Sequence, residues 1–309
     1  MKEPRSDKRD IDNRLRDAVY RLKKKYKFPY SMAHIKDRAN NYVSKYHDKV
    51  KEDFAFAESV NDSFCLGINN NDATLVIVKE SMIKCFDEYI LSKKEKECSI
   101  LNQYLTCSFR IDMNQMDASH PMYDFFKAHD GEYSVENMEM FLQEMYDSIF
   151  QDTIKYKQFR AYIAKMDLDN DLKQVYSLSE QMKLDRLLYH IFPFLDSFQD
   201  DSETLMKKWP KIAERWFSLN NEYLRHDLLL IQGYTLLDMH PLFNDKLKKG
   251  KNTLDNIIRD GNHCFYASNA NYFVSEDANT RKKTAFIYGA YGIRTKVICE
   301  TEFLNCFDF

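Results

Sequence analysis

The C-terminal part of the chain alternates between helical and strand-like patterns, and this alternation constrains the fold more than any other feature. It predicts in order a helix, a strand, a helix, a turn at Gly292 and a strand, over Thr253–Asn269, Asn271–Ser275, Arg281–Tyr291 and Thr295–Ile298. When short turns join a strand, a helix and a second strand in this order, the two strands are expected to be parallel and connected by a right-handed crossover. The sequence therefore predicts an α/β protein.

The N-terminal part has the same mixed pattern, whereas the middle does not. Residues 11–25 have apolar side chains three or four positions apart, as in an amphipathic helix, and Ser31 is suited to cap a helix that begins near Met32. A further helix is expected over 48–60 and a short strand over 63–68. From 74 to about 239 the helical period dominates, which predicts a helical segment between the two mixed ends.

Composition indicates a packed intracellular protein. The chain is 44% hydrophobic and has only 7 Gly and 6 Pro among 309 residues, which argues against a disordered or linker-rich chain. No apolar run approaches the ~18–20 residues that cross a bilayer, and the polar N-terminus does not resemble a signal peptide. The 7 cysteines include no C-x-x-C pair and are expected to be reduced. We therefore expect a cytoplasmic protein with no membrane partner.

Charge is distributed unevenly along the chain. Residues 1–50 hold 15 Lys and Arg against 7 Asp and Glu, and residues 246–296 hold 10 against 4, whereas the stretch between them holds 20 against 34. This pattern suggests that the basic ends fold together and that the acidic middle forms a separate subdomain. A basic surface around a site favours a phosphate-bearing partner, although basic ends also occur simply as solvated helix faces.

Two carboxylates stand out by position. Asp260 lies in the helix that leads to the predicted strand at Tyr272–Val274, and Asp277 directly follows that strand. Ligands of parallel α/β sheets bind beyond the carboxyl ends of the strands, and converging carboxylates there suit Mg²⁺ or Mn²⁺. The alternative is structural: Asp277 caps the next helix and Asp260 is a surface acid.

Several segments together resemble PIN-like nuclease domains. The C-terminal match consists of Asp260–Ala267, Tyr272–Asp277, Gly292–Ile298 and Glu302-Phe303, and Phe28–Asp37 is similar to the second strand and following helix of the family. The resemblance covers roughly residues 10–68 and 233–306. It implies a PIN-like parallel sheet flanked by helices, formed from residues 1–68 and 241–309, with a large all-helical insertion over 69–240.

The family resemblance implies a divalent-metal-dependent endoribonuclease. Asp37, Asp260 and Asp277 carry over as the acids that hold Mg²⁺ or Mn²⁺ and activate water against the phosphodiester. Ser275 matches the residue that holds the loop of the last acid. His34 and His263 are candidates to orient the acids or contact phosphate, and the alternative is that local hydrogen bonds satisfy them. Four basic residues are candidates to contact the backbone of RNA, or alternatively DNA: Arg38, Arg281, Lys282 and Lys283.

One part of the family pattern is missing. PIN-like domains begin with a central strand that ends in an acid, and no apolar run precedes the first helix here. Either the chain is a truncated version of a longer protein, or the insertion or another chain supplies the strand, or the protein is an inactive relative. We expect the first. The rival function is a catalytically inactive PIN-like interaction protein whose helical insertion binds a partner protein.

Overall fold

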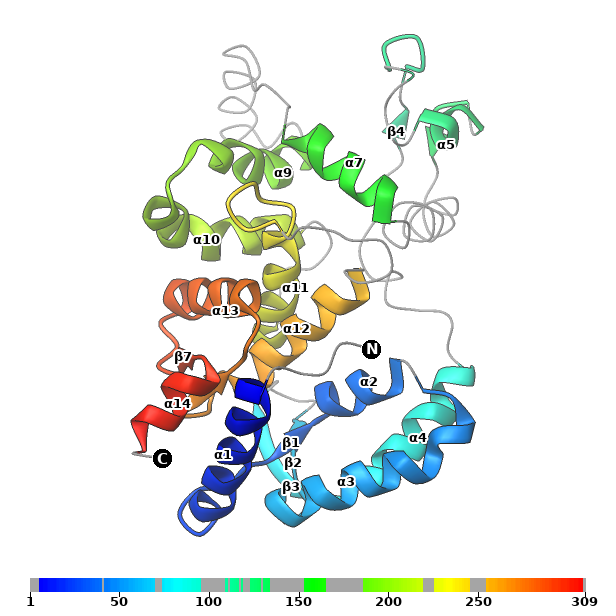
Figure 1. Cartoon of the computed structure of the whole chain (residues 1–309). Helices are drawn as coiled ribbons and strands as arrows, with labels where there is room; N and C mark the ends of the chain where they lie inside the picture. The colour runs from blue at the N-terminus through cyan, green and yellow to red at the C-terminus, as the bar shows by residue number, and fades with distance from the viewer. Residues whose placement is uncertain are drawn as a thin grey trace. The chain divides into compact units, whose positions relative to one another are not determined.

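The structure is a computed structural model, and it describes residues 6–40, 42–69, 74–95, 109–110, 112–116, 118, 123–128, 130–133, 153–164, 186–218, 225–244 and 254–307. The described residues form a mixed α/β structure that is mostly helical (Figure 1). The chain divides into two compact units. Unit 1 consists of Met1–Glu97 and Arg259–Phe309, and unit 2 of Cys98–Ile258. Both ends of the chain thus belong to one unit.

Unit 1 contains most of the elements that the sequence predicts as α/β. Its helices are α1 (Ser6–Leu22), α2 (Met32–Asn40), the short 3-10 helix η1 (Ser44–Tyr46), α3 (His47–Asn61), α4 (Met82–Glu95), α13 (Ala278–Tyr291) and α14 (Glu300–Cys306). Helix α12 (Leu254–Ala267) begins in unit 2 and ends in unit 1. The start of α2 at Met32 and the left-handed Gly292, with φ of 65°, at the end of α13 agree with the predicted boundaries.

Two small sheets lie in unit 1. In the first, β1 (Tyr30–Ser31) pairs in parallel with β2 (Phe64–Ile68), which pairs antiparallel with β3 (Leu75–Lys79). In the second, β6 (Tyr272–Val274) pairs in parallel with β7 (Lys296–Ile298), as the C-terminal pattern predicts. Among the described residues the two sheets share no paired strand. A single PIN-like parallel sheet is therefore not confirmed, because the described strands of unit 1 form two separate small sheets and β3 is antiparallel to its neighbour.

The predicted all-helical insertion over 69–240 is wrong at its start. Residues 75–79 form strand β3 and, with α4, belong to unit 1. Three consecutive β-branched residues, Val76, Ile77 and Val78, favour a strand over the helix that the longer-range period suggested. Unit 2 also contains a short antiparallel pair, β4 (Phe109–Arg110) with β5 (Glu132–Tyr133).

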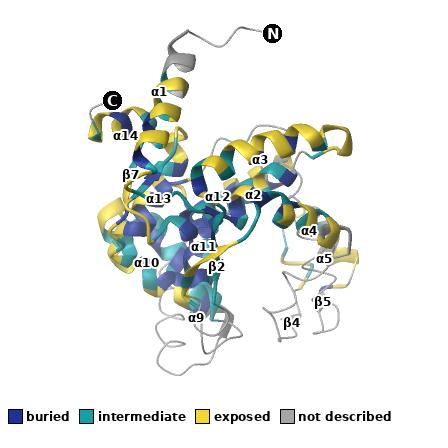
Figure 2. Ribbon diagram, turned by 90° about the horizontal axis from the view of Figure 1, so that it is seen from below, coloured by how far each residue is buried: buried dark blue, intermediate teal, exposed yellow. Residues whose placement is uncertain are grey.

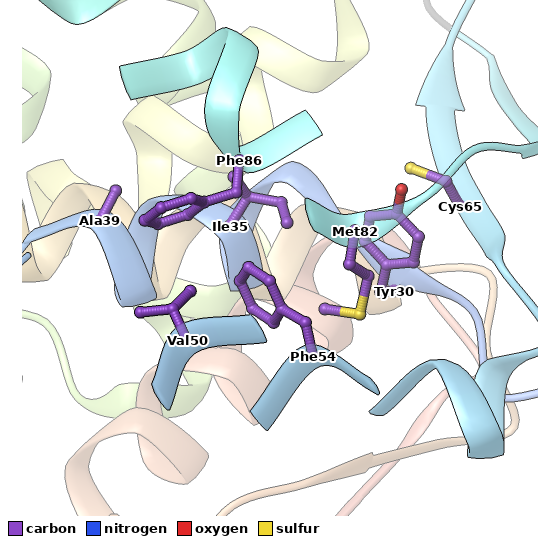
Figure 3. Packing of buried hydrophobic residues seen from close by; sticks show 8 residues of the cluster. All are labelled: Tyr30, Ile35, Ala39, Val50, Phe54, Cys65, Met82 and Phe86. Carbon is purple, nitrogen blue, oxygen red and sulfur yellow. The ribbon is translucent and has the colours of Figure 1, made fainter. Parts of the chain in front are cut away.

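The N-terminal core of unit 1 lies among α2, α3 and α4. Phe86 of α4 is completely buried and packs edge-on against Phe54 of α3, with ring centroids 5.5 Å apart. The same cluster also contains buried residues of α2, α3, α4 and the first sheet, which are Ile35, Ala39, Val50, Met82, Tyr30 and Cys65 (Figure 3). Helix α3 buries one face and exposes the other (Figure 2). This packing fixes α2, the helix that carries Asp37.

Unit 2 is mainly helical where it is described. Its helices are α5 (Tyr123–Ala128), α7 (Thr153–Ile163), α9 (Arg186–Asp196), the 3-10 helix η3 (Ser197–Gln199), α10 (Ser202–Phe217) and α11 (His226–Leu237). Trp209 is buried, and Phe194 contacts both Trp209 and the partly buried Trp216. A buried Asp238 accepts hydrogen bonds from Tyr156 and Arg160. No helix among the described residues is long and apolar enough to span a membrane.

The cysteines of the described part of the chain form no disulfide. Cys65, Cys85, Cys264, Cys299 and Cys306 are all free thiols. Cys98 and Cys107 lie outside the described residues.

Candidate active site

Asp37 and His263 meet although they come from opposite ends of the chain. Nε2 of His263, on α12, lies 2.6 Å from Oδ2 of Asp37, on α2. Oδ1 of the same carboxylate lies 3.1 Å from Nε of Arg259. Desolvation raises the pKa of Asp37, but the hydrogen bond and charge of His263 and the charge of Arg259 outweigh it, so the pKa lies below its ordinary value. Asp37 is therefore held ionised, with Arg259 and His263 as its partners.

Helix α12 presents its functional residues on two faces. Arg259 and His263 are four residues apart, so they share one face, and both reach Asp37. Asp260 is displaced around the helix and instead accepts a hydrogen bond from Oγ1 of Thr280, on α13, at 3.2 Å. The helix thus joins an acid on α2 to the acids beside α13.

Asp260 is a partly buried acid with a perturbed proton affinity. Burial is the main cause that raises its pKa to about 6, and the charge of Asp277 adds to this. The Thr280 hydrogen bond and the charges of His263 and Lys283 oppose the increase. The structure therefore does not support the alternative that Asp260 is an ordinary surface acid. A carboxyl group that titrates near neutral pH can accept or release a proton in catalysis.

Asp277 and Ser275 organise the loop between β6 and α13. The carboxylate of Asp277 caps α13 by accepting from the backbone N–H of Thr280 at 2.8 Å. The hydroxyl of Ser275 accepts from the backbone N–H of Asp277 at 3.2 Å, and its carbonyl accepts from Nη1 of Arg281 at 2.7 Å. The capping interpretation of Asp277 is thus confirmed, and its exposed position leaves carboxylate oxygen accessible.

His34 lies beside His263. Their rings meet edge to face, with centroids 4.9 Å apart. Nδ1 of His34 accepts from the backbone N–H of Ser31 at 3.2 Å. His34 lines a cavity and is exposed to solvent there, and desolvation by the neighbouring protein groups, followed by the charge of His263, lowers its pKa to about 4. His34 is therefore neutral at physiological pH.

The four predicted basic contacts differ in their surroundings. Arg38 forms an ion pair with Asp53, and Arg281 is engaged with the Ser275 loop. Lys282 is exposed. Lys283 is only 1% exposed and acts on Asp260 through its charge, so its predicted contact with a nucleic-acid backbone is wrong for this conformation.

The acids form linked pairs around His263. The charge of His263 lowers the pKa of both Asp37 and Asp260, and the charge of Asp277 raises the pKa of Asp260. Within the part of the chain that the structure describes, no three or more His, Cys, Asp or Glu residues are close enough to hold one metal ion. Asp37 already faces Arg259 and His263. The predicted donor types suit Mg²⁺ or Mn²⁺, but their arrangement does not fit a ready-formed three-ligand site.

Sequence reasoning missed Arg259 and Thr280. Arg259 precedes Asp260 and is one helical turn from His263, a spacing that places both residues on one helix face. Thr280 stands three residues after the capping Asp277, where an N-cap acid finds its backbone partner. Local spacing therefore contained a signal for both, whereas the partner of Arg259 depends on tertiary packing.

Comparisons with known proteins gave no match: no family model fits the chain, and neither the curated proteins nor the solved structures include a significant relative. The functional argument therefore rests on the residues themselves.

Proposed function

We propose that unit 1 is a PIN-like domain that hydrolyses phosphodiester bonds in RNA, with Asp37, Asp260 and Asp277 as its essential acids and Mg²⁺ or Mn²⁺ as cofactor. The observation that carries the proposal is the contact between Asp37 and His263. Two segments selected separately for their resemblance to PIN-like nucleases, one near each end of the chain, meet at this contact. The parallel pairs β1–β2 and β6–β7 are further support.

The protein's own residues have distinct roles in this proposal. Asp260, with its pKa near 6, accepts a proton from the attacking water or returns one to the leaving oxygen. His263 and Arg259 hold Asp37 in its ionised form. Exposed Lys282 and the basic N-terminal region attract the polyanionic backbone of RNA. Carboxylate oxygens are the ligands that hard divalent ions prefer, which is why the cofactor belongs to the proposal.

The rival function is an inactive PIN-like protein whose helical segment binds a partner protein. The observation that favours it is the ion pair between Asp37 and Arg259, because an arginine there takes the place that a cation needs. The two functions differ in whether the acids matter for RNA cleavage.

The deciding experiment is cleavage of a mixed RNA pool by the purified full chain in Mn²⁺, beside an Asp260→Asn/Asp277→Asn double variant. Asparagine retains an acceptor for Thr280 at both positions and is itself a good helix cap, so the variant is expected to fold. We expect cleavage by the parent protein that disappears in the variant and in EDTA. Cleavage that survives the double substitution would overturn the assignment, and no cleavage by the folded parent would favour the rival.

A further inference from the structure

Strands β1 and β6 each have an unpaired edge. Strand β1 is at the end of its sheet, and β6 is at the end of the other. In β6, the carbonyl of Asn271 and the N–H of Ser275 bond to β7. Because peptide groups alternate in direction along a strand, those of Tyr272 and Val274 point away from β7. No strand among the described residues pairs with either edge.

Both edges border the same cavity in unit 1. The cavity has a volume of about 780 Å³ and is lined by Tyr30 and Ser31 of β1 and by residues 272–274 of β6. Its remaining walls are largely apolar and come mainly from α1, α3, α14 and the residue that follows α14, including Leu15, Val19, Leu22, Val60, Phe303 and Phe307. The backbone N–H of Ser31 already donates to Nδ1 of His34, whereas Tyr272 and Val274 turn peptide groups toward the open edge of β6. The apolar cavity beside that edge offers hydrophobic contact and backbone hydrogen bonds together. This combination matches an extended peptide better than a compact small molecule.

A basic turn lies beside the cavity. A second hollow of about 240 Å³ shares Tyr26 and Phe28 with it and is lined by Lys23, Lys24, Lys25 and Lys27. Asp62 is the acid among the residues that line this hollow, and it pairs with Lys23. Lys24 and Lys25 are exposed. The positive charge favours an occupant that carries acidic residues next to its apolar part.

We infer that unit 1 binds an extended segment of a partner polypeptide as a β-strand between β1 and β6. A strand in this position lies in a largely apolar cavity, so its side chains are expected to be apolar. Acidic residues at one end meet the lysine turn at Lys23–Lys27. The segment joins the two sheets of unit 1 into one. This inference concerns binding and does not depend on whether unit 1 cleaves RNA.

A peptide-binding assay tests the inference with the full chain. The probe is a fluorescein-labelled peptide of three glutamates followed by five alternating valine and isoleucine residues, and fluorescence anisotropy measures its binding. We expect saturable binding and slower hydrogen exchange at the amides of Tyr272 and Val274, which point to the open edge. A peptide with proline at its central apolar position loses a ladder hydrogen bond and is expected to bind at least about tenfold more weakly.

A charge variant provides the matched control on the protein side. Lys24→Glu/Lys25→Glu reverses two exposed charges beside the cavity, and Lys45→Glu/Lys49→Glu reverses two exposed charges elsewhere in unit 1. The first double variant is expected to weaken binding and the second to leave it unchanged. Absence of saturable binding, or equal binding of the proline peptide, overturns the inference. Self-association of the protein that blocks the peptide would overturn the assignment to a partner, because a second copy would then be the occupant.

Discussion

Nε2 of His263 lies 2.6 Å from Oδ2 of Asp37, and the two residues are separated by 226 positions in the chain. This contact joins α2, fixed by the N-terminal core, to α12, which leads into β6. Since Arg259 holds the other oxygen of the same carboxylate, Asp37 is fixed from two directions. The position of Asp260 next to this contact makes α12 the centre of the candidate site.

The perturbed Asp260 gives a signature in the pH dependence of stability. Its pKa of about 6 in the folded state exceeds the ordinary value of 3.8, so the folded state binds more protons between these values. The ionised carboxyl therefore costs stability above pH 6, and the cost disappears as the pH falls below 4. Asp260→Asn is expected to raise the free energy of unfolding by roughly 1–3 kcal/mol at pH 8 and to have little effect near pH 3. Urea unfolding at both pH values checks this, and a destabilised variant at pH 8 would contradict it.

His34 gives the opposite pH dependence. Its pKa is lowered from 6.5 to about 4, so the unfolded state binds more protons in this interval. The contribution of His34 to stability is therefore present above pH 6.5 and is lost as the pH falls towards 4. His34→Gln is expected to flatten the stability profile in this range. Urea midpoints at pH 7, 5.5 and 4 measure it, and an unchanged slope would exclude the proposed environment of the ring.

Two substitutions of Asp277 distinguish its role as the helix cap of α13 from the role of its charge. Asp277→Ala removes the acceptor for the N–H of Thr280 and is expected to cost about 1 kcal/mol, whereas Asp277→Asn retains an acceptor and is expected to cost much less. Thermal unfolding followed by circular dichroism distinguishes the two variants. Equal destabilisation by both would show that charge, not the capping hydrogen bond, stabilises the start of α13.

Truncation of Phe86 is expected to destabilise the N-terminal core of unit 1. This side chain is 0% exposed, and truncation to alanine leaves a cavity among α2, α3 and α4. Phe86→Ala is expected to lower the free energy of unfolding by about 3–5 kcal/mol. Leu91→Ala on the same helix is the matched control, because Leu91 is 63% exposed and its loss removes little packing. Similar urea midpoints for both variants would contradict the proposed core.

The sequence predicted the local elements of unit 1 better than their assembly. The boundary at Met32, the turn at Gly292 and the pair β6–β7 follow from capping residues, glycine and short-range pattern. Strand β3 was missed because a helical period over a long window outweighed the β-branched run at 76–78. In that case the local propensity was the better guide.

The candidate site was predictable in its members but not in its pairings. Asp37, His263, Asp260 and Asp277 were all selected from the sequence, and the structure links them by contact or by charge. The ion pair of Arg259 with Asp37 and the burial of Lys283 depend on how α12 and α13 pack, which no local spacing specifies. Long-range packing therefore decided which charges compensate the acids.

RNA cleavage by a pair of matched variants tests the central claim most directly. Asp277→Asn alters an acid of the site while retaining a capping acceptor, and Asp48→Asn alters a carboxylate that is 96% exposed and outside the site. With the full chain in Mn²⁺, we expect Asp277→Asn to lower the single-turnover cleavage rate by about 100-fold or more and Asp48→Asn to leave it unchanged. Equal rates for parent, Asp277→Asn and Asp48→Asn would contradict the proposal that these acids cleave RNA.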